Sequence, residues 1–298
     1  MRIQLWIAAF ALGLAGAVPA QAQEWKVVEH PPIRILYQQG NGAEAAVLAR
    51  GAPAVLAQLE EDLGIREEGP FVIRILPSRG PGEASDEAAP HWAVGYVRGG
   101  SREVVLRGVW VRTYPFGDLL SLFGHEMTHV LLNTLPAAES VPRWFHEGLA
   151  VMESRRWSFR DAFALGTTVL VGRPTPLSRL SRSFPSEDDA ARAAYAESFH
   201  FVSYLEREHG PGAIRRILDR MRAGASFPQA FREALGRDLA TEETAWRDHV
   251  NFAYRWVPAL TSTGVLWMGI TLLVLASRIA RIRRDRNLLE TWKRQGFE

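Results

Sequence analysis

The sequence predicts an α+β fold, in which a small mixed β-sheet in the first half of the chain precedes a helical second half. Two patterns predict it. Short segments of alternating apolar residues, typical of strands, lie between residues 32 and 107, whereas longer segments of helical periodicity follow from residue 118. Of the 298 residues, 47% are hydrophobic and 23% are charged, so the chain can build a sizeable core and is too apolar to be disordered.

In the first half, one helix is expected among the strands. It covers residues 43–63 and ends at Gly64, since glycine readily adopts the left-handed conformation that closes helices. A loop rich in Gly, Pro and acidic residues is expected over 78–91, and a turn at Gly99-Gly100. The expected strands are 32–37, 71–76, 93–97 and 103–107.

The second half reads as a series of helices. Asp118 is the expected N-cap of a helix over 119–134, and Pro142 is the expected first residue of the next. Residues 155–188 look irregular. The expected helices are 119–134, 142–153, 190–209, 212–222, 226–235 and one from about Thr241 that leads to the C-terminal segment.

Residues 1–22 read as a secretory signal peptide. An apolar run follows Arg2, and Ala20-Gln21-Ala22 is an A-x-A cleavage site. The alternative is an uncleaved N-terminal membrane helix, for which the apolar run is short. We expect removal of the signal and export of the body.

Residues 257–277 are uncharged and long enough to predict one transmembrane helix, with a buried core helix as the alternative. Residues 278–298 then form a basic tail, which the excess of Lys and Arg places in the cytoplasm. We therefore expect a single-pass protein of the cell membrane with its catalytic part outside the cytoplasm, in the periplasm. Between the two ends, 23–116 is the predicted α/β part and 117–256 the helical part.

The charge and cysteine content exclude several classes of site and partner. The chain has no cysteine, which excludes disulfides, thiol nucleophiles and Cys-ligated metals. The net charge is +2, but residues 257–298 carry seven basic and three acidic residues, whereas 23–256 carry 27 basic and 30 acidic. We expect no nucleic-acid partner, because the body has no basic excess.

One motif carries metal chemistry, and it falls on the helix expected over 119–134. It is H-E-x-x-H, here His125-Glu126-Met127-Thr128-His129. Residues four apart share a helix face, so both imidazoles can reach one zinc ion. Glu126 is rotated by about 100°, where it can act as a base on a zinc-bound water without being a ligand.

Catalytic zinc sites usually hold three protein ligands, so a third is needed. The best candidate is Glu147, which lies 18 residues after His129 on the next expected helix. A turn at 134–141 would fold that helix back across the first. The sequence thus predicts one zinc ion per chain, bound by His125, His129 and Glu147, with Glu126 taking the water proton and passing it to the leaving amine.

The motif and several later segments resemble the gluzincin metallopeptidases, and most closely the peptidase-MA-like family. The resemblance covers roughly 30–255. It implies a gluzincin, thermolysin-like fold, the metal ligands His125, His129 and Glu147, and Glu126 as the base. The Gly-x-Met-Glu-Asn motif of aminopeptidases is not seen, so trimming of N-termini is not implied. The segments that carry the resemblance are 125–129, 144–150, 194–199, 201–205 and 230–236, followed by Trp246.

A gluzincin transition state also needs a donor opposite the zinc ion. By its place in the resemblance, Tyr195 is the candidate, with packing between helices as its alternative role and His200 and His146 as further candidates. Glu153 either orients a ligand histidine or lies on a solvated face. The strands at 93–97 and 103–107 either bind an extended peptide or are plain sheet structure.

These inferences together predict a membrane-anchored, extracytoplasmic zinc endopeptidase that acts on peptides or proteins. Two alternatives stay open. One is a non-catalytic envelope module that keeps the fold and binds a partner, although such a module has no need of Glu126. The other is an amidase that acts on cell-wall peptide, for which the zinc chemistry is the same.

Overall fold

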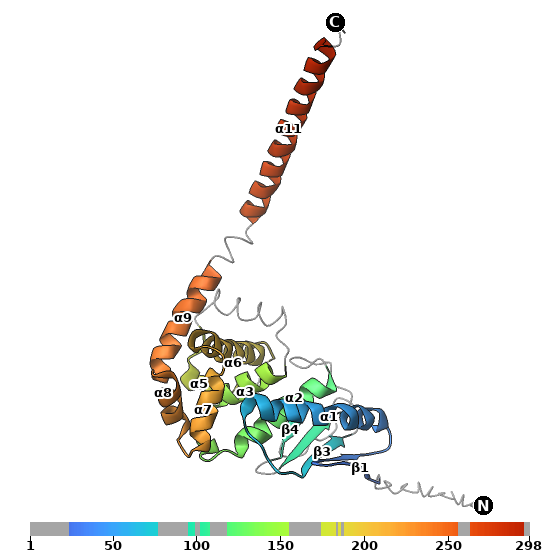
Figure 1. The fold of residues 1–298 in the computed structure, drawn as a ribbon, viewed down its shortest axis with the longest axis vertical. Coiled ribbons are helices and arrows are strands. Elements are labelled where there is room, and N and C mark those ends of the chain that lie inside the picture. Colours follow the sequence, from blue (N-terminus) through green and yellow to red (C-terminus); the bar gives the residue numbers. More distant parts are fainter. Residues whose placement is uncertain are drawn as a thin grey trace, which may run out of the picture.

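The computed structural model describes residues 24–76, 95–98, 102–107, 118–154, 174–182, 184–185, 188–255 and 263–294. Its first half holds a five-stranded sheet in the order β1-β2-β3-β5-β4 (Figure 1). The central strands β2, β3 and β5 run parallel, and the edge strands β1 and β4 are antiparallel to their neighbours. The strands are β1 (Lys26–His30), β2 (Ile33–Tyr37), β3 (Phe71–Leu76), β4 (Gly95–Val97) and β5 (Glu103–Arg107).

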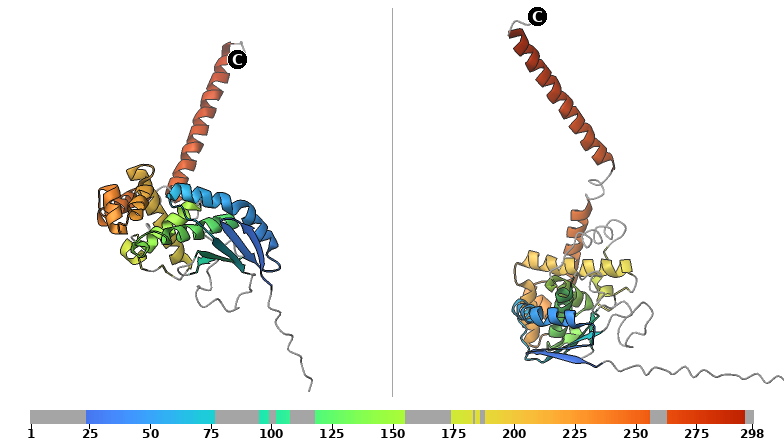
Figure 2. Two further views of the ribbon diagram at one scale, coloured as in Figure 1. Left: turned by 60° about the horizontal axis from the view of Figure 1, so that its bottom comes forward. Right: turned by 90° about the vertical axis from the view of Figure 1, so that its right-hand side faces the viewer.

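Two helices, α1 (Gly42–Leu63) and α2 (Leu119–Asn133), pack side by side against this sheet (Figure 2). α1 connects the parallel strands β2 and β3, and α2 contacts β4 and β5 at the other end of the sheet. The helices approach closely at Gly51, where a Cβ would lie 2.5 Å from Cδ1 of Leu120. α2 is therefore held between a helix and the edge of the sheet.

The second half is helical, as expected. α3 packs along α6, and an aromatic cluster fills the space among α3, α6, α8 and α9. Trp144, Phe201 and Trp246 are fully buried within it. The elements are η1 (Ala138–Ser140), α3 (Arg143–Glu153), α5 (Leu177–Leu180), α6 (Asp188–His209), α7 (Ala213–Arg222), α8 (Phe227–Leu235) and α9 (Leu239–Arg255).

Most predicted elements are confirmed to within three residues. Asp118 caps α2, with its side chain accepting a hydrogen bond from the backbone N–H of Ser121 at 2.8 Å. Pro142 is the N-cap residue of α3 rather than its first helical residue. β1 was not predicted, because this edge strand is largely exposed and shows no buried alternation. The predicted loop at 78–91, the Gly99-Gly100 turn and most of 155–188 lie outside the described residues.

The last described element is α11 (Thr263–Arg294), which extends away from the body (Figure 1). It continues through residues that the sequence assigned to a separate tail after 277. Among the helices of the described ranges, none combines the length and the apolar character that a bilayer crossing requires. The predicted span over 257–277 therefore has no support from the structure. Residues 257–262 and the predicted signal at 1–22 are not among those described.

A buried carboxylate fixes the segment that precedes α5. Glu197 on α6 is fully buried, and its Oε2 accepts a hydrogen bond from the backbone N–H of Thr175 at 3.1 Å. Nearby, Oε1 of Glu243 on α9 accepts one from the N–H of Leu177 at 3.0 Å. Burial raises the pKa of Glu197 to about 7, against the opposing effects of the Thr175 hydrogen bonds and of Arg247.

This raised pKa makes the free energy of unfolding depend on pH. The folded state favours the protonated form of Glu197. The contribution of this carboxyl group to the free energy of unfolding is therefore full below the unfolded pKa of 4.5 and is lost as pH rises through about 7. The loss is about 3 kcal/mol. We expect Glu197→Gln to stabilise the protein by an amount that grows across this pH window, as measured by urea unfolding. A gain that is constant from pH 4.5 to 8.5 would contradict this account.

Candidate metal centre

Two of the three predicted metal ligands lie on one face of α2. The helix is buried on most sides, between α1 and the sheet, and His125 and His129 are one turn apart on the face toward α3. Their Nε2 atoms are 3.2 Å apart, and the two rings meet edge to face with centroids 4.8 Å apart. Both imidazoles thus direct their Nε2 atoms toward the same point.

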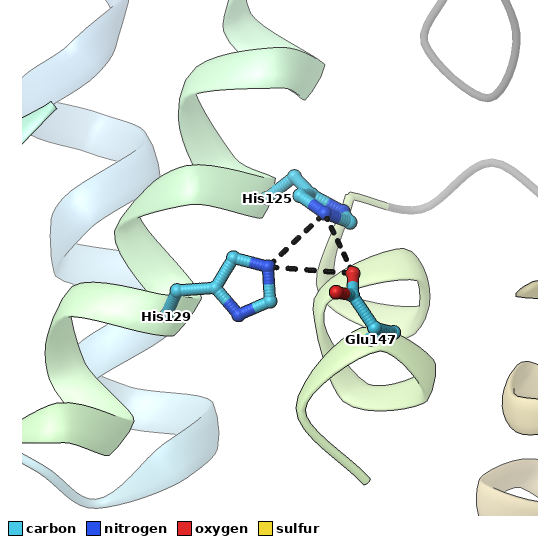
Figure 3. Close-up of side chains that lie close together, drawn as sticks. All are labelled: His125, His129 and Glu147. Atoms are coloured by element: carbon cyan, nitrogen blue, oxygen red, sulfur yellow. Dashed lines mark hydrogen bonds and ion pairs between the residues drawn. The ribbon is translucent and has the colours of Figure 1, made fainter. Parts of the chain in front are cut away.

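The third predicted ligand comes from α3. A short connection with η1 reverses the chain after α2, and α3 begins after Pro142, whose backbone is extended. Oε2 of Glu147 lies 3.6 Å from Nε2 of His125 and 3.6 Å from Nε2 of His129. Figure 3 shows the three side chains pointing toward one another.

The donor set fits a zinc ion. Zinc–nitrogen and zinc–oxygen bonds of about 2.0–2.2 Å in tetrahedral geometry place donor atoms roughly 3.3–3.6 Å apart. The three separations measured here are 3.2, 3.6 and 3.6 Å. Among the residues that the structure describes, this is the one group of three or more His, Asp or Glu side chains that could hold a metal ion. Three ligands leave a fourth position, as catalytic zinc requires.

Glu126 lies beside this donor set and contributes no atom to it. Its side chain is buried with 5% exposure and lies against Gly95 of the edge strand β4. A Cβ on residue 95 would stand 2.9 Å from Oε1 of Glu126, so glycine leaves the carboxylate its space. Burial raises the pKa of Glu126 to about 7, with His129 opposing and Glu147 adding to the shift. A carboxylate of this pKa suits general-base work near neutral pH.

The other titratable groups near the site are shifted in different directions. Burial tends to raise the pKa of Glu147, but His125 and His129 together hold it well below its usual range. Burial lowers the pKa of His146 to about 4, and its ring centroid lies 5.7 Å from that of His129. Glu147 therefore faces the histidines as a carboxylate, and His146 lies beside them as a neutral imidazole.

The candidate oxyanion donors Tyr195 and His200 have different partners in the structure. Tyr195 is half-buried on α6, with its ring 5.2 Å from that of Phe184. Phe184 in turn lies under the guanidinium of Arg143, which pairs with Glu147. His200 instead accepts a hydrogen bond from Nε1 of Trp246 at 2.9 Å, which turns it toward α9. A series of three contacts, Tyr195–Phe184, Phe184–Arg143 and Arg143–Glu147, thus joins Tyr195 to a candidate metal ligand.

Sequence reasoning missed two residues next to the site. Arg143 is one turn before Glu147 and donates from Nε to its Oε1 at 3.3 Å. An i, i+4 spacing between a basic and an acidic residue is a visible signal for such a pair. Gly95 was included in a strand, but its contact with Glu126 joins residues 31 positions apart and has no local signal.

A family model described as the Peptidase MA superfamily matches residues 51–252 of this chain. This range includes all three metal-ligand candidates and Glu126, and it covers more than half of the sequence. The chain therefore belongs to the Peptidase MA superfamily, as the resemblance of its motifs predicted. No curated protein matches it.

The chain is similar to two solved structures, to different degrees. One is an M1 zinc metallopeptidase from Deinococcus radiodurans, solved as a point mutant, with a TM-score of 0.50, 14% identity, and coverage of 75% of this chain and 52% of that one. The other is Legionella pneumophila aminopeptidase A in complex with aspartic acid, with a TM-score of 0.43, 13% identity, and coverage of 76% and 28%. The chain thus spans about half the length of the first neighbour, and that likeness supports the gluzincin-like fold.

Proposed function

We propose that this protein is a zinc-dependent endopeptidase in which Glu126 is the general base. The observation that carries the proposal is the convergence of two imidazole nitrogens and one carboxylate oxygen beside a buried glutamate, in a member of the Peptidase MA superfamily. The substrate class, peptides or proteins, follows from that family. The absence of an aminopeptidase motif from the sequence favours internal cleavage.

Each residue has a role in the proposed reaction. His125, His129 and Glu147 would hold the ion, which supplies Lewis acidity that activates a water and polarises the scissile carbonyl. Glu126 accepts a proton as the water oxygen bonds to the carbonyl carbon. It then delivers this proton to the amide nitrogen as the C–N bond breaks, so that an acid and an amine leave. Tyr195 is the proposed donor to the developing oxyanion.

The decisive experiment uses the purified full chain and a quenched library of random peptides, with added zinc and with a chelator. We expect cleavage that the chelator abolishes and that zinc restores. Mass spectrometry of the products locates the cut bonds, and internal cuts are expected. No cleavage by a folded, zinc-loaded chain would contradict the proposal and favour a binding module. Cleavage of cell-wall peptides without cleavage of the library would favour the amidase.

The edge strand β4 offers a place for an extended substrate. Arg98 donates its backbone N–H to the carbonyl of Glu103 at 3.0 Å. Val97 precedes Arg98 and lies opposite Val104 of β5. Because bonded and non-bonded pairs alternate in an antiparallel ladder, the N–H and C=O of Val97 point away from β5. On that side a peptide could pair with β4 and pass Glu126, which lies against Gly95.

Val97→Pro should therefore raise KM roughly 3- to 10-fold, because it removes one outward N–H worth about 1 kcal/mol. The change in kcat should be smaller. Val97→Ala is the matched control, since it removes side-chain packing and keeps the N–H. Steady-state kinetics with a peptide identified in the library screen measures both. Equal KM values for the two variants would argue against pairing at this edge.

The proposed location is outside the cytoplasm, with the signal at residues 1–22 as its basis. Expression of the full chain in a bacterial host, followed by mass spectrometry of the mature N-terminus, should find Gln23 first. Fractionation of the same cells tests whether the predicted span over 257–277 holds the chain in the membrane. A mature protein that keeps residues 1–22 would contradict the proposed export signal.

A further inference from the structure

The two oxygens of Glu147 have different partners. Oε2 lies 3.6 Å from each of the two histidine nitrogens, whereas Oε1 accepts a hydrogen bond from Nε of Arg143 at 3.3 Å. The carboxylate is buried, and the Arg143 side chain that meets it is 43% exposed. Arg143 therefore occupies the oxygen that does not face the histidines.

Arg143 also contacts residues that follow α5. Its backbone N–H donates to the carbonyl of Ser181 at 3.3 Å, and its guanidinium lies 5.3 Å from the ring centroid of Phe184. Ser181 is the C-cap of α5, and Phe184 also contacts Tyr195 on α6. The stretch after α5 thus fixes the arginine at its backbone and at its guanidinium end, while its Nε meets Glu147.

We propose that Arg143 is a positioning residue that keeps Glu147 oriented with one oxygen toward the histidines. A carboxylate without this partner can rotate and offer both oxygens, or turn away from the imidazoles. Partners of metal-ligating side chains fix their orientation in this way, and their loss typically lowers metal affinity 10- to 100-fold. Arg143 touches neither substrate nor reacting atoms in this role.

The test measures metal binding by the full chain, without reference to activity. Zinc affinity is determined by competition with a chromogenic chelator for wild type, Arg143→Gln and Arg143→Lys. We expect a 10- to 100-fold loss for Arg143→Gln. Arg143→Lys should fall between the two, because lysine keeps the charge but lacks a guanidinium Nε. The visible absorption of the cobalt(II)-loaded chain should change in Arg143→Gln, because it reports the ligand geometry around the ion.

Arg215→Gln is the matched control. Arg215 on α7 donates from Nε to Oδ1 of Asp219 four residues later at 3.1 Å, in the same arrangement but on a helix that carries no metal ligand. The zinc affinity and the cobalt spectrum of Arg215→Gln should equal those of wild type. Equal zinc affinity and equal spectra for wild type and Arg143→Gln would overturn the proposal. The positioning role of Arg143 rests on the metal site proposed above. The zinc titration of the wild type tests that site separately, because a wild type that binds no zinc contradicts the metal site itself.

Discussion

Glu126→Gln should abolish most peptide cleavage and leave zinc binding intact. Glutamine fills nearly the same space against Gly95 but cannot accept the water proton, so kcat should fall by about 10²- to 10⁴-fold. The carboxylate contributes no atom to the donor group, so zinc affinity should stay within about twofold of wild type. Steady-state kinetics and a zinc titration on the same preparation measure both.

Glu147→Gln is the comparison variant, because it should lose zinc affinity, which Glu126→Gln should keep. It removes the anionic donor and should lower zinc affinity strongly, with activity recovering in part at high zinc concentration. A Glu126→Gln variant that keeps more than a tenth of wild-type kcat would mean that another group takes the proton. Loss of zinc from Glu126→Gln would mean instead that the variant disturbs the ligands.

Gly148→Ala should weaken both folding and metal binding. α3 meets α6 at this residue, where a Cβ would lie 2.5 Å from the backbone oxygen of Ser198 and 2.8 Å from Cγ2 of Val202. A backbone atom cannot move aside as a flexible side chain can, so α3 must shift and carry the neighbouring Glu147 with it. We expect a stability loss of about 1–3 kcal/mol. Zinc affinity should fall about 10-fold or more.

Gly124→Ala is the matched control, since Gly124 also lies inside a helix and next to a metal ligand. Its added Cβ would meet only the Cγ1 of Val55, at 3.3 Å, and alanine favours helices by roughly 0.5–1 kcal/mol over glycine. The melting temperature and zinc affinity of this variant should match or exceed those of wild type. Similar losses in both variants would show that helix-packing distance is not the cause.

Local patterns were enough to predict most of the fold. Helix periodicity, Asp118 and Gly64 identified α2 and the end of α1, because caps and faces are properties of neighbouring residues. The exposed edge strand β1 has no such periodicity and was missed. Strand order was also beyond the sequence, because β5 lies between β3 and β4 through pairings that no local pattern encodes.

For the candidate site too, local spacing predicted the metal ligands but not the contacts that orient them. His125 and His129 follow from helical spacing, and Glu147 from a second helix at a plausible distance. The contact of Gly95 with Glu126 depends on how α2 crosses the sheet edge, and the contact of Phe184 with Arg143 depends on how the chain after α5 packs. Such contacts between distant segments fix the orientation of the functional side chains, and no spacing rule predicts them.

The metal ligands lie on two helices, α2 and α3, that contact each other and whose other neighbours differ. The helix of His125 and His129 lies on α1 and the sheet, whereas the helix of Glu147 lies on α6. A bound ion would therefore act as a cross-link between the sheet layer and the helical layer. Because ligand binding to the folded state adds to its stability, zinc should couple the unfolding of the two layers. Amide hydrogen exchange should then slow on both sides of the ion, in α1 as well as in α6.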